Sequence, residues 1–501
     1  MPRSKPSKGS PSSCSHDAVY IGKSPGAIAL SYYEPPSQEE RLAAATISGK
    51  VSSASQIPPL STFPGVNLIP QDSLDLDPKE TGQSLREFAY TRGRNSVTRE
   101  RRTLYVVDVP QVTAEATAMN TWMKPEIPFE LAAGSSSRLV DEDQPQVDDI
   151  ADYMKAFYHG LEVKLLRNTS RFTTWRNSSI NPRPSSDSTS QSRGRVGFVI
   201  GGKAHPVQFR TSPDGVAVGQ LNLNDMLDAL LTVVPIDAFA IILLTHHDLY
   251  EDEEDDFCAG RAYGGSRICI ASTFRYRPAL DNYNNISHAH SWPASHCRAY
   301  VDALWEESEP KLKAMKRGKR GQGFDPSSMI RLKDHAQRPL IAAITASQRT
   351  LVPKTKADRE SVWLARVCRT ASHELGHCVG IAHCTYYACT MQSTANMAED
   401  VRQPPYLCPV CLNKVAYSMV GEAVIKSRGT QKEVRRNAVE AQWVVESYQQ
   451  MQLFCERNNS VGMFGGYRAW LGERLRELED QEDDHEKGEK MEIIEISDDD
   501  D

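Results

Sequence analysis

The chain has 501 residues, 40% of them hydrophobic, and a formal net charge of −7. Residues 477–501 contain 14 acidic and 2 basic side chains, so residues 1–476 carry a net charge of +5. The apolar runs are far shorter than the roughly 20 residues of a membrane-spanning helix, and no apolar stretch follows the basic start of the chain. We therefore expect no membrane span and no secretory signal.

The same features predict an intracellular monomer of the cytoplasm, the nucleus or both. In those compartments, 11 cysteines are better explained by metal binding and buried thiols than by disulfides.

The hydrophobic pattern predicts one domain, at residues 61–460. Residues 1–60 are rich in Ser and Pro and lack periodicity, which predicts a disordered leader. Strand patterns lie at 103–109, 162–166, 196–200 and 238–245, and helix patterns lie at 150–157, 223–231 and 434–448. Polar stretches predict flexible insertions near 167–195 and 279–340 and a largely disordered acidic tail at 461–501. Helices alternating with strands predict an α/β (α+β) fold with a mixed sheet.

One stretch of this domain carries metal-site spacing. His373 and His377 are four residues apart, so a helix presents both imidazoles on one face. Gly380 can end that helix in the left-handed conformation and turn the chain so that His383 supplies a third nitrogen. Three histidines leave one position of a tetrahedral zinc open for water, and Glu374 is placed to take a proton from that water. The alternative, a helix with surface histidines, does not explain the full spacing.

Four cysteines follow directly, as the pairs Cys384 with Cys389 and Cys408 with Cys411. Two such pairs favour a closed structural zinc site, while a redox-active pair would lie in a βαβ pattern that is not visible here. The chain is therefore expected to bind two Zn²⁺ ions. Met391 lies between the pairs and is either core filling or the residue of a turn beneath the metal.

These residues together resemble the archaemetzincins, in the eukaryotic branch of that family. The resemblance extends loosely over residues 60–455 and rests on His373, Glu374, His377, Gly380, His383, Cys384, Cys389, Met391, Cys408 and Cys411. It implies a metzincin-like zinc peptidase with a catalytic zinc on the three histidines, Glu374 as general base, Met391 as the Met-turn residue and a second zinc on the cysteines.

The resemblance also implies a substrate-binding edge strand above the zinc. The matching segment includes Ile268, Ile270 and Ser272, and an edge strand can hold an extended peptide by strand addition. An ordinary sheet strand is the alternative. Tyr386 and Tyr387 are candidates for stabilising the oxyanion because they lie near the histidines in sequence.

Two charged segments suggest partners. The basic residues of 311–320 are typical of nuclear import or nucleic-acid contacts, or of a solvated face. Ile493, Ile494 and Ile496, flanked by acids, resemble a SUMO-interacting motif, and a solubilising tail is the alternative.

The main functional hypothesis is a zinc metallopeptidase that hydrolyses peptide bonds in peptide or protein substrates. Two alternatives are a weakly active zinc scaffold and a chromatin-associated protease, each recruited to SUMO-modified partners through the tail. An intact Glu374 weighs against the scaffold, since a structural site needs no general base.

Overall fold

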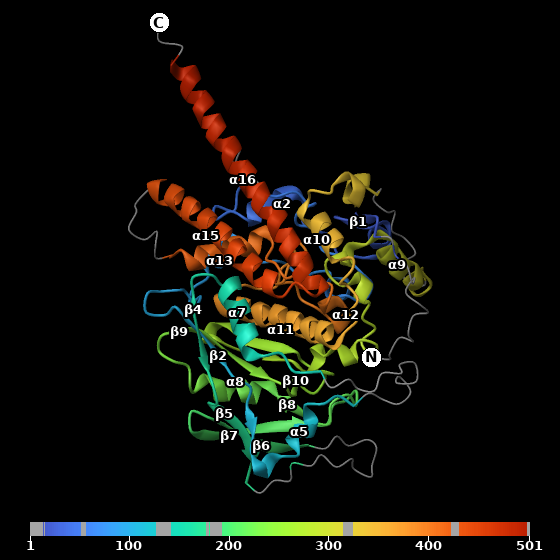
Figure 1. The fold of residues 1–501 in the computed structure, drawn as a ribbon, viewed down its shortest axis with the longest axis vertical. Helices are drawn as coiled ribbons and strands as arrows, with labels where there is room; N and C mark the ends of the chain where they lie inside the picture. Colours follow the sequence, from blue (N-terminus) through green and yellow to red (C-terminus); the bar gives the residue numbers. More distant parts are fainter. Residues whose placement is uncertain are drawn as a thin grey trace.

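The computed structural model describes residues 14, 16–51, 57–126, 142–176, 180, 193–313, 324–421 and 430–497, without the side chains of 309–313, 430–435 and 482–497. Two sheets lie on one side of the long helix α11 (Lys356–Val379), and other helices lie on the opposite side (Figure 1). Across the described part of the chain, every helix is too short or too polar to cross a membrane.

The sheet next to α11 has five strands and confirms the predicted mixed α/β class. Its order is β11 (Gly260–Tyr263), β12 (Ile268–Ser272), β9 (Ala238–Thr245), β2 (Thr103–Val107) and β4 (Glu162–Leu166). The last four strands are parallel, and β11 is antiparallel to β12. The inner strands β12, β9 and β2 are buried on both faces, because their alternate residues enter different cores. In β9, Ile242 and Leu244 pack toward α11, while Ile241 and Leu243 join the core of the second sheet.

The second sheet has six strands and lies farther from α11 (Figure 1). Its order is β10 (Asp248–Tyr250), β8 (Gln220–Asn222), β7 (Lys203–Arg210), β6 (Arg193–Ile200), β5 (Ser170–Thr174) and β3 (Gln111–Val112). Helix α8 (Leu223–Leu231) packs between the two sheets through Leu227 and Leu230. The predicted insertion at 167–195 was therefore wrong in part, because β5 and the start of β6 lie within it.

Helix α11 begins and ends at sequence-coded signals. Thr355 is the N-cap, and its side chain and that of Asp358, the third helical residue, form a capping box. Gly380 follows the last turn with a φ of +103°, and the backbone N–H of Ile381 donates to the carbonyl of Gly376. The predicted helix end at Gly380 is confirmed.

Further helices are α7 (Val147–Phe157), α13 (Pro409–Met419), α15 (Thr430–Arg457), α16 (Gly462–Ser497) and the short α3 (Ser73–Leu76), α4 (Leu85–Tyr90), α5 (Met119–Trp122) and α12 (Met397–Asp400). Of these, α5 contributes Met119 and Trp122 to the core of the second sheet. Single 3-10 turns occur at Ala114–Ala116, Gly264–Ser266, Phe274–Tyr276, Pro278–Leu280, His288–His290, Ala294–His296, Pro326–Ser328 and Leu332–Asp334.

The expected disordered leader is corrected from residue 16 onward. Its ordered elements are β1 (Ala18–Tyr20), α1 (Pro25–Leu30) and α2 (Gln38–Ala44). Strand β1 pairs antiparallel with β13 (Met329–Arg331), which belongs to the expected insertion at 279–340. That insertion also contains α9 (Arg298–Lys313) and the start of α10 (Pro339–Ser347), and Trp305 of α9 is buried. Each segment is polar on its own and becomes ordered through a partner that is distant in sequence.

The expected disordered tail is corrected in its first part. In α16, Phe464, Tyr467, Trp470 and Leu471 are buried, and their spacing of three and four residues is that of a helix face packed on a core. The Trp470 ring stacks on Tyr406, with ring centroids 4.4 Å apart.

Candidate metal centre

The C-terminal turns of α11 bring three imidazoles together. His373 and His377 lie one turn apart with their Nε2 atoms separated by 3.1 Å. The turn at Gly380 returns His383 to the same place, and its ring centroid lies 5.5 Å from that of His373 and 5.0 Å from that of His377. One ligand atom from each residue lies within 4.8 Å of the other two. The predicted convergence of the three histidines is therefore present in the structure.

The second nitrogen of each ring is held by an acceptor. His373 Nδ1 donates to the carbonyl of Thr390 and His377 Nδ1 donates to the carbonyl of Ile381, each over 2.7 Å. His383 Nδ1 lies 3.2 Å from a carboxylate oxygen of Glu80. Because carbonyls only accept, the protons of the neutral His373 and His377 rings are on Nδ1.

This arrangement fits a bound cation. Two neutral rings with protonated Nδ1 atoms point Nε2 lone pairs at each other over 3.1 Å, and a metal ion would satisfy both of them. Burial, followed by the neighbouring rings, lowers the pKa of His373 well below its usual value and that of His377 to about 4. Both rings are thus uncharged at neutral pH, as metal binding requires.

Glu374 lies beside the histidines and is buried. Desolvation raises the pKa of its carboxyl to about 8, against the opposing charges of Arg261 and Arg369. A cation on the three histidines would favour the ionised carboxylate and lower this pKa. The ionisation of Glu374 thus depends on the charges around it.

Strand β11 lies directly over this carboxyl. A Cβ atom added to Gly260 would lie 2.8 Å from Oε1 of Glu374, so only glycine leaves room there. The next residue, Arg261, is half exposed and its Nη2 lies 3.0 Å from a carboxylate oxygen of Glu251. Together, β11, the histidine face of α11 and residues 392–397 line an open cleft of about 1240 Å³.

The four cysteines form a second cluster behind the histidines. Cys384, Cys389, Cys408 and Cys411 are fully or almost fully buried, and their sulfurs lie within 4.8 Å of one another. The backbone N–H of Cys408 donates to the sulfur of Cys389 over 3.3 Å.

The polar surroundings of this cluster suit a negatively charged site. Hydrogen bonds from the other three thiols, with help from the charge of Lys414, lower the pKa of Cys384 well below its usual value. Lys414 is fully buried and its Nζ has no hydrogen-bond partner within the described residues. A dication held by four thiolates has a net charge of −2, which a buried ammonium would partly balance.

Residues 347–417, which include both clusters, match the sequence model of Peptidase family M54. Over this segment and beyond it, the chain is similar to proteins of the archaemetzincin family. Archaemetzincin-2 of Homo sapiens is 26% identical over 291 residues, which are 58% of this chain and 58% of that protein. Archaemetzincin-1 of Homo sapiens is 23% identical over 198 residues, which are 40% of this chain and 30% of that protein. The chain thus spans about half the length of the curated archaemetzincin-2 that it matches. It spans 30% of the length of archaemetzincin-1.

Among solved structures, the archaemetzincin of Methanopyrus kandleri matches 64% of this chain and 98% of its own chain, at 15% identity and a TM-score of 0.28. The human relatives agree with the eukaryotic branch of archaemetzincins expected from the sequence.

The predicted substrate strand was wrong in one respect. Ile268, Ile270 and Ser272 lie in β12, an inner strand whose residues are all buried. The edge of the described sheet is β11, which pairs outside β12 and lines the cleft. The sequence of β11, Gly-Arg-Ala-Tyr, carries no strand signal. The prediction therefore took its inner neighbour, β12, as the edge strand.

The tyrosines suggested as oxyanion partners are also placed elsewhere. The Tyr386 hydroxyl donates to the carbonyl of Gly82, and Tyr387 is buried against Phe63 and Arg41. Neither tyrosine lines the cleft. Sequence reasoning missed Glu80, which lies far from the histidines in sequence and outside any motif. It quoted Arg261 within the segment similar to the edge strand but gave that residue no role.

The remaining expectations stay predictions. The side chains of 311–320 and those of Ile493, Ile494 and Ile496 lie outside the described residues. The SUMO and nucleic-acid partners, the monomeric state and the intracellular location stay predictions as well.

Proposed function

We propose that this chain is a zinc-dependent peptidase of the metzincin type, with His373, His377 and His383 as ligands of the catalytic zinc and Glu374 as general base. The observation that carries this proposal is the convergence of three imidazoles, each with Nδ1 held by an oxygen, beside one buried carboxyl.

Different residues of the chain would have different roles in the reaction. The Thr390 and Ile381 carbonyls and the Glu80 carboxylate orient the imidazoles, so that free nitrogens are directed at one point. When bound there, zinc would lower the pKa of a water molecule and polarise the substrate carbonyl. Glu374 would accept a proton on its carboxylate and pass it to the leaving amine.

The substrate would be an extended peptide bound along β11. The outer edge of β11 has no strand partner among the described residues, so its backbone groups are available for strand addition. The cleft beside it contains Arg261, which offers a cation to a substrate carboxylate or carbonyl. Peptide backbone recognition on β11 would place the scissile bond between the strand and α11.

A second, structural zinc on the four cysteines would hold the segment that carries His383. Cys384 follows that histidine directly, and its backbone N–H donates to the carbonyl of Met391 over 2.8 Å. Met391 is fully buried beneath the histidines, at the position of a Met-turn residue.

The test is hydrolysis of a peptide library by the zinc-loaded chain, with Glu374→Gln as the matched variant. We expect the wild type to cleave, and the variant to keep its zinc and lose cleavage by at least 10²-fold, because a proton acceptor contributes about that much. Equal turnover by both proteins would reject Glu374 as the base. No cleavage by a zinc-loaded wild type would favour the scaffold hypothesis.

A further inference from the structure

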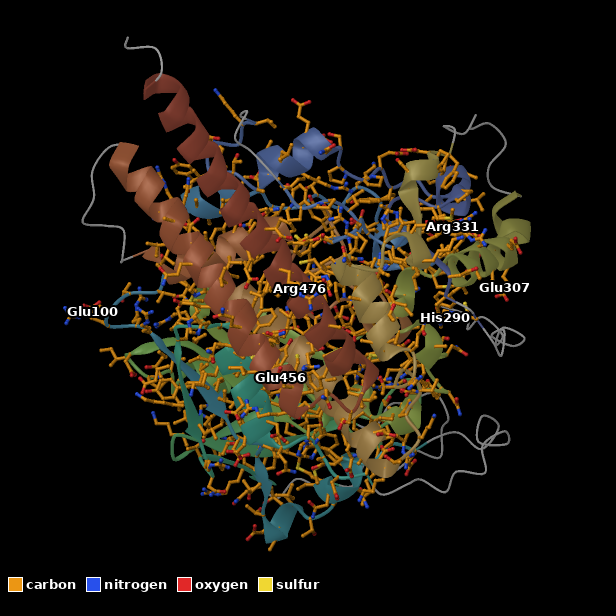
Figure 2. All side chains as sticks on the ribbon, turned by 45° about the horizontal axis from the view of Figure 1, so that its top comes forward. Glu100, His290, Glu307, Arg331, Glu456 and Arg476 are labelled. Carbon is orange, nitrogen blue, oxygen red and sulfur yellow. The ribbon has the colours of Figure 1, made fainter. Side chains whose placement is uncertain are left out.

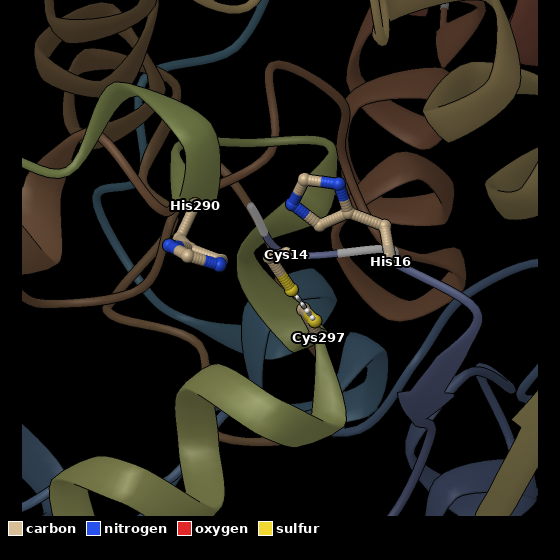
Figure 3. Close-up of side chains that lie close together, drawn as sticks. All are labelled: Cys14, His16, His290 and Cys297. Atoms are coloured by element: carbon tan, nitrogen blue, oxygen red, sulfur yellow. Dashed lines mark hydrogen bonds between the residues drawn. The ribbon is translucent and has the colours of Figure 1, made fainter. Parts of the chain in front are cut away.

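A third group of metal-ligating side chains lies away from the cleft. Cys14 and His16 come from the segment before β1, and His290 and Cys297 come from the loop before α9 (Figure 3). One ligand atom from each lies within 4.8 Å of the other three. We propose that Cys14, His16, His290 and Cys297 bind a further zinc ion as a closed structural site.

The two imidazoles are oriented as metal ligands are. His16 Nε2 lies 2.9 Å from the carbonyl of Ala289, which can only accept, so Nε2 carries the proton and Nδ1 keeps a free lone pair. His290 Nδ1 lies 2.9 Å from the Ser287 hydroxyl. An oxygen partner on one ring nitrogen thus leaves the other nitrogen for the metal, as at the three histidines of the cleft.

The Nε2 atom of His290 provides a second, independent observation that points to a bound ligand. The residue is fully buried, and its Nε2 has no hydrogen-bond partner within the described residues. Its ring stacks on Tyr300 with centroids 4.2 Å apart and meets the His16 ring edge-on at 5.3 Å. A buried nitrogen without a hydrogen-bond partner is unfavourable, so a ligand at this atom is expected.

The cysteines complete a set of four donors. Cys14 and Cys297 are free thiols with sulfurs 3.1 Å apart, close to the 3.5 Å between Cys384 and Cys408. The backbone N–H groups of Ala299 and Tyr300, in the first turn of α9, donate to the Cys297 sulfur. Two thiolates and two imidazoles in this arrangement select zinc.

The site would be structural because all four positions are occupied by protein. Cys297 and His290 are buried, and His16 is only 8% exposed. Four donors leave no position for water or substrate, in contrast to the three histidines of the cleft.

The metal would join two segments that are 283 residues apart in sequence. Val19 of β1 already forms an isolated bridge with Cys297, and Figure 2 shows His290 and Arg331 on the same side of the molecule. The N-terminal segment held in this way reaches the four-cysteine cluster. The Tyr33 hydroxyl donates to the carbonyl of Thr385, and Arg41 Nε donates to that of Tyr386 over 2.9 Å. The further zinc would therefore fix the segment that covers the second zinc.

Native mass spectrometry of the full chain, purified with zinc and a reductant, tests the inference. We expect three zinc ions in the wild type and two in Cys14→Ala. The matched control is Cys455→Ala, because Cys455 is buried in α15 and belongs to no cluster of metal ligands among the described residues; it should keep three. Two ions in the wild type, an equal count in wild type and Cys14→Ala, or a Cys14–Cys297 disulfide in the reduced preparation would overturn it.

A second variant covers the case in which Cys14→Ala does not fold. Cys14→His replaces the thiolate by another zinc ligand and should fold with three ions, whereas two ions in this variant would contradict the site. Peptide cleavage is measured separately. Three ions without cleavage would reject only the proposed peptidase function, and two ions with cleavage would reject only the further site.

Discussion

Gly376 of α11 lies directly against the sulfur of Met391. A Cβ atom added to Gly376 would lie 2.3 Å from Sδ, and Met391 is fully buried, so the sulfur occupies the space of the missing side chain. The Met391 turn thus supports the helix between Glu374 and His377. We expect Gly376→Ala to lower the free energy of unfolding by about 1–3 kcal/mol, as overpacking does, and to weaken zinc retention.

Denaturant unfolding of the zinc-loaded chain, with metal analysis after dialysis, measures both effects. The matched control is Gly472→Ala in α16, where the nearest atom to an added Cβ is the end of the Gln452 side chain at 3.4 Å. There, alanine should stabilise the helix by about 0.5–1 kcal/mol. If Gly376→Ala were equally stabilising, the close packing of Met391 beneath the metal would be rejected.

Glu80 is expected to control zinc affinity without touching the ion. Its carboxylate lies 3.2 Å from His383 Nδ1, and an outer partner of this kind typically contributes 10–100-fold in affinity. Glu80→Ala should therefore raise the zinc dissociation constant by roughly that factor, and Glu80→Gln should lose less because its amide oxygen still accepts. A competition titration against a chromophoric chelator gives the constants.

Glu39 provides the control for Glu80. It is exposed in the first turn of α2, so Glu39→Ala should leave the zinc dissociation constant unchanged. Equal constants for Glu80→Ala and Glu39→Ala would show that His383 needs no partner.

The parts of this site that could be predicted are those whose residues lie close together in the sequence. The four-residue spacing of His373 and His377, the glycine that ends α11 and the paired cysteines all act over short distances along one helix and its turn, and each was found where the spacing placed it. The strands β2, β4 and β9 were also predictable, because hydrophobic runs bounded by polar residues mark buried parallel strands.

The parts that were missed depend on contacts distant in sequence. Strand β1 finds its partner β13 more than 300 residues later, and neither short strand has a periodicity of its own. Cys14 and His290 likewise share no local motif, because metal ligands on separate loops are joined only by the fold. Helix α16 is different, because Phe464, Tyr467 and Trp470 already have helical spacing. The acidic composition after residue 477 hid that signal.

A half-buried ion pair in α15 should make stability depend on pH. Burial raises the pKa of Glu440 from 4.5 to about 7, although Arg436, 3.3 Å away, opposes the rise. The folded state thus binds this proton more tightly than the unfolded state does. The contribution of Glu440 to stability is greatest below pH 4.5 and falls as the pH rises through 7.

Glu440→Gln isolates this effect, because an amide has no proton to lose. Between pH 5.5 and 8 the wild type should lose about 2 kcal/mol relative to the variant, which follows from the two pKa values. Denaturant unfolding at several pH values measures the difference between the two proteins, which removes the pH dependence that they share. A constant difference over this range would show that Glu440 ionises normally.

The edge strand and the general base should be coupled through Gly260. Alanine at this position would bring a Cβ atom within 2.8 Å of Glu374 Oε1 and 3.0 Å of the Ile270 carbonyl. The Ile270 carbonyl belongs to the rigid inner strand β12, so the carboxyl of Glu374 must move instead. A displacement of about 1 Å in a catalytic group can cost 10²-fold in rate. We expect Gly260→Ala to lower kcat by about that factor and to leave the zinc content unchanged.

Gly265→Ala, five residues along the same hairpin, is the matched control, because an added Cβ there meets no atom within 4 Å. Steady-state cleavage of one peptide by both variants decides the question, and equal kcat values would show that β11 does not set the position of Glu374.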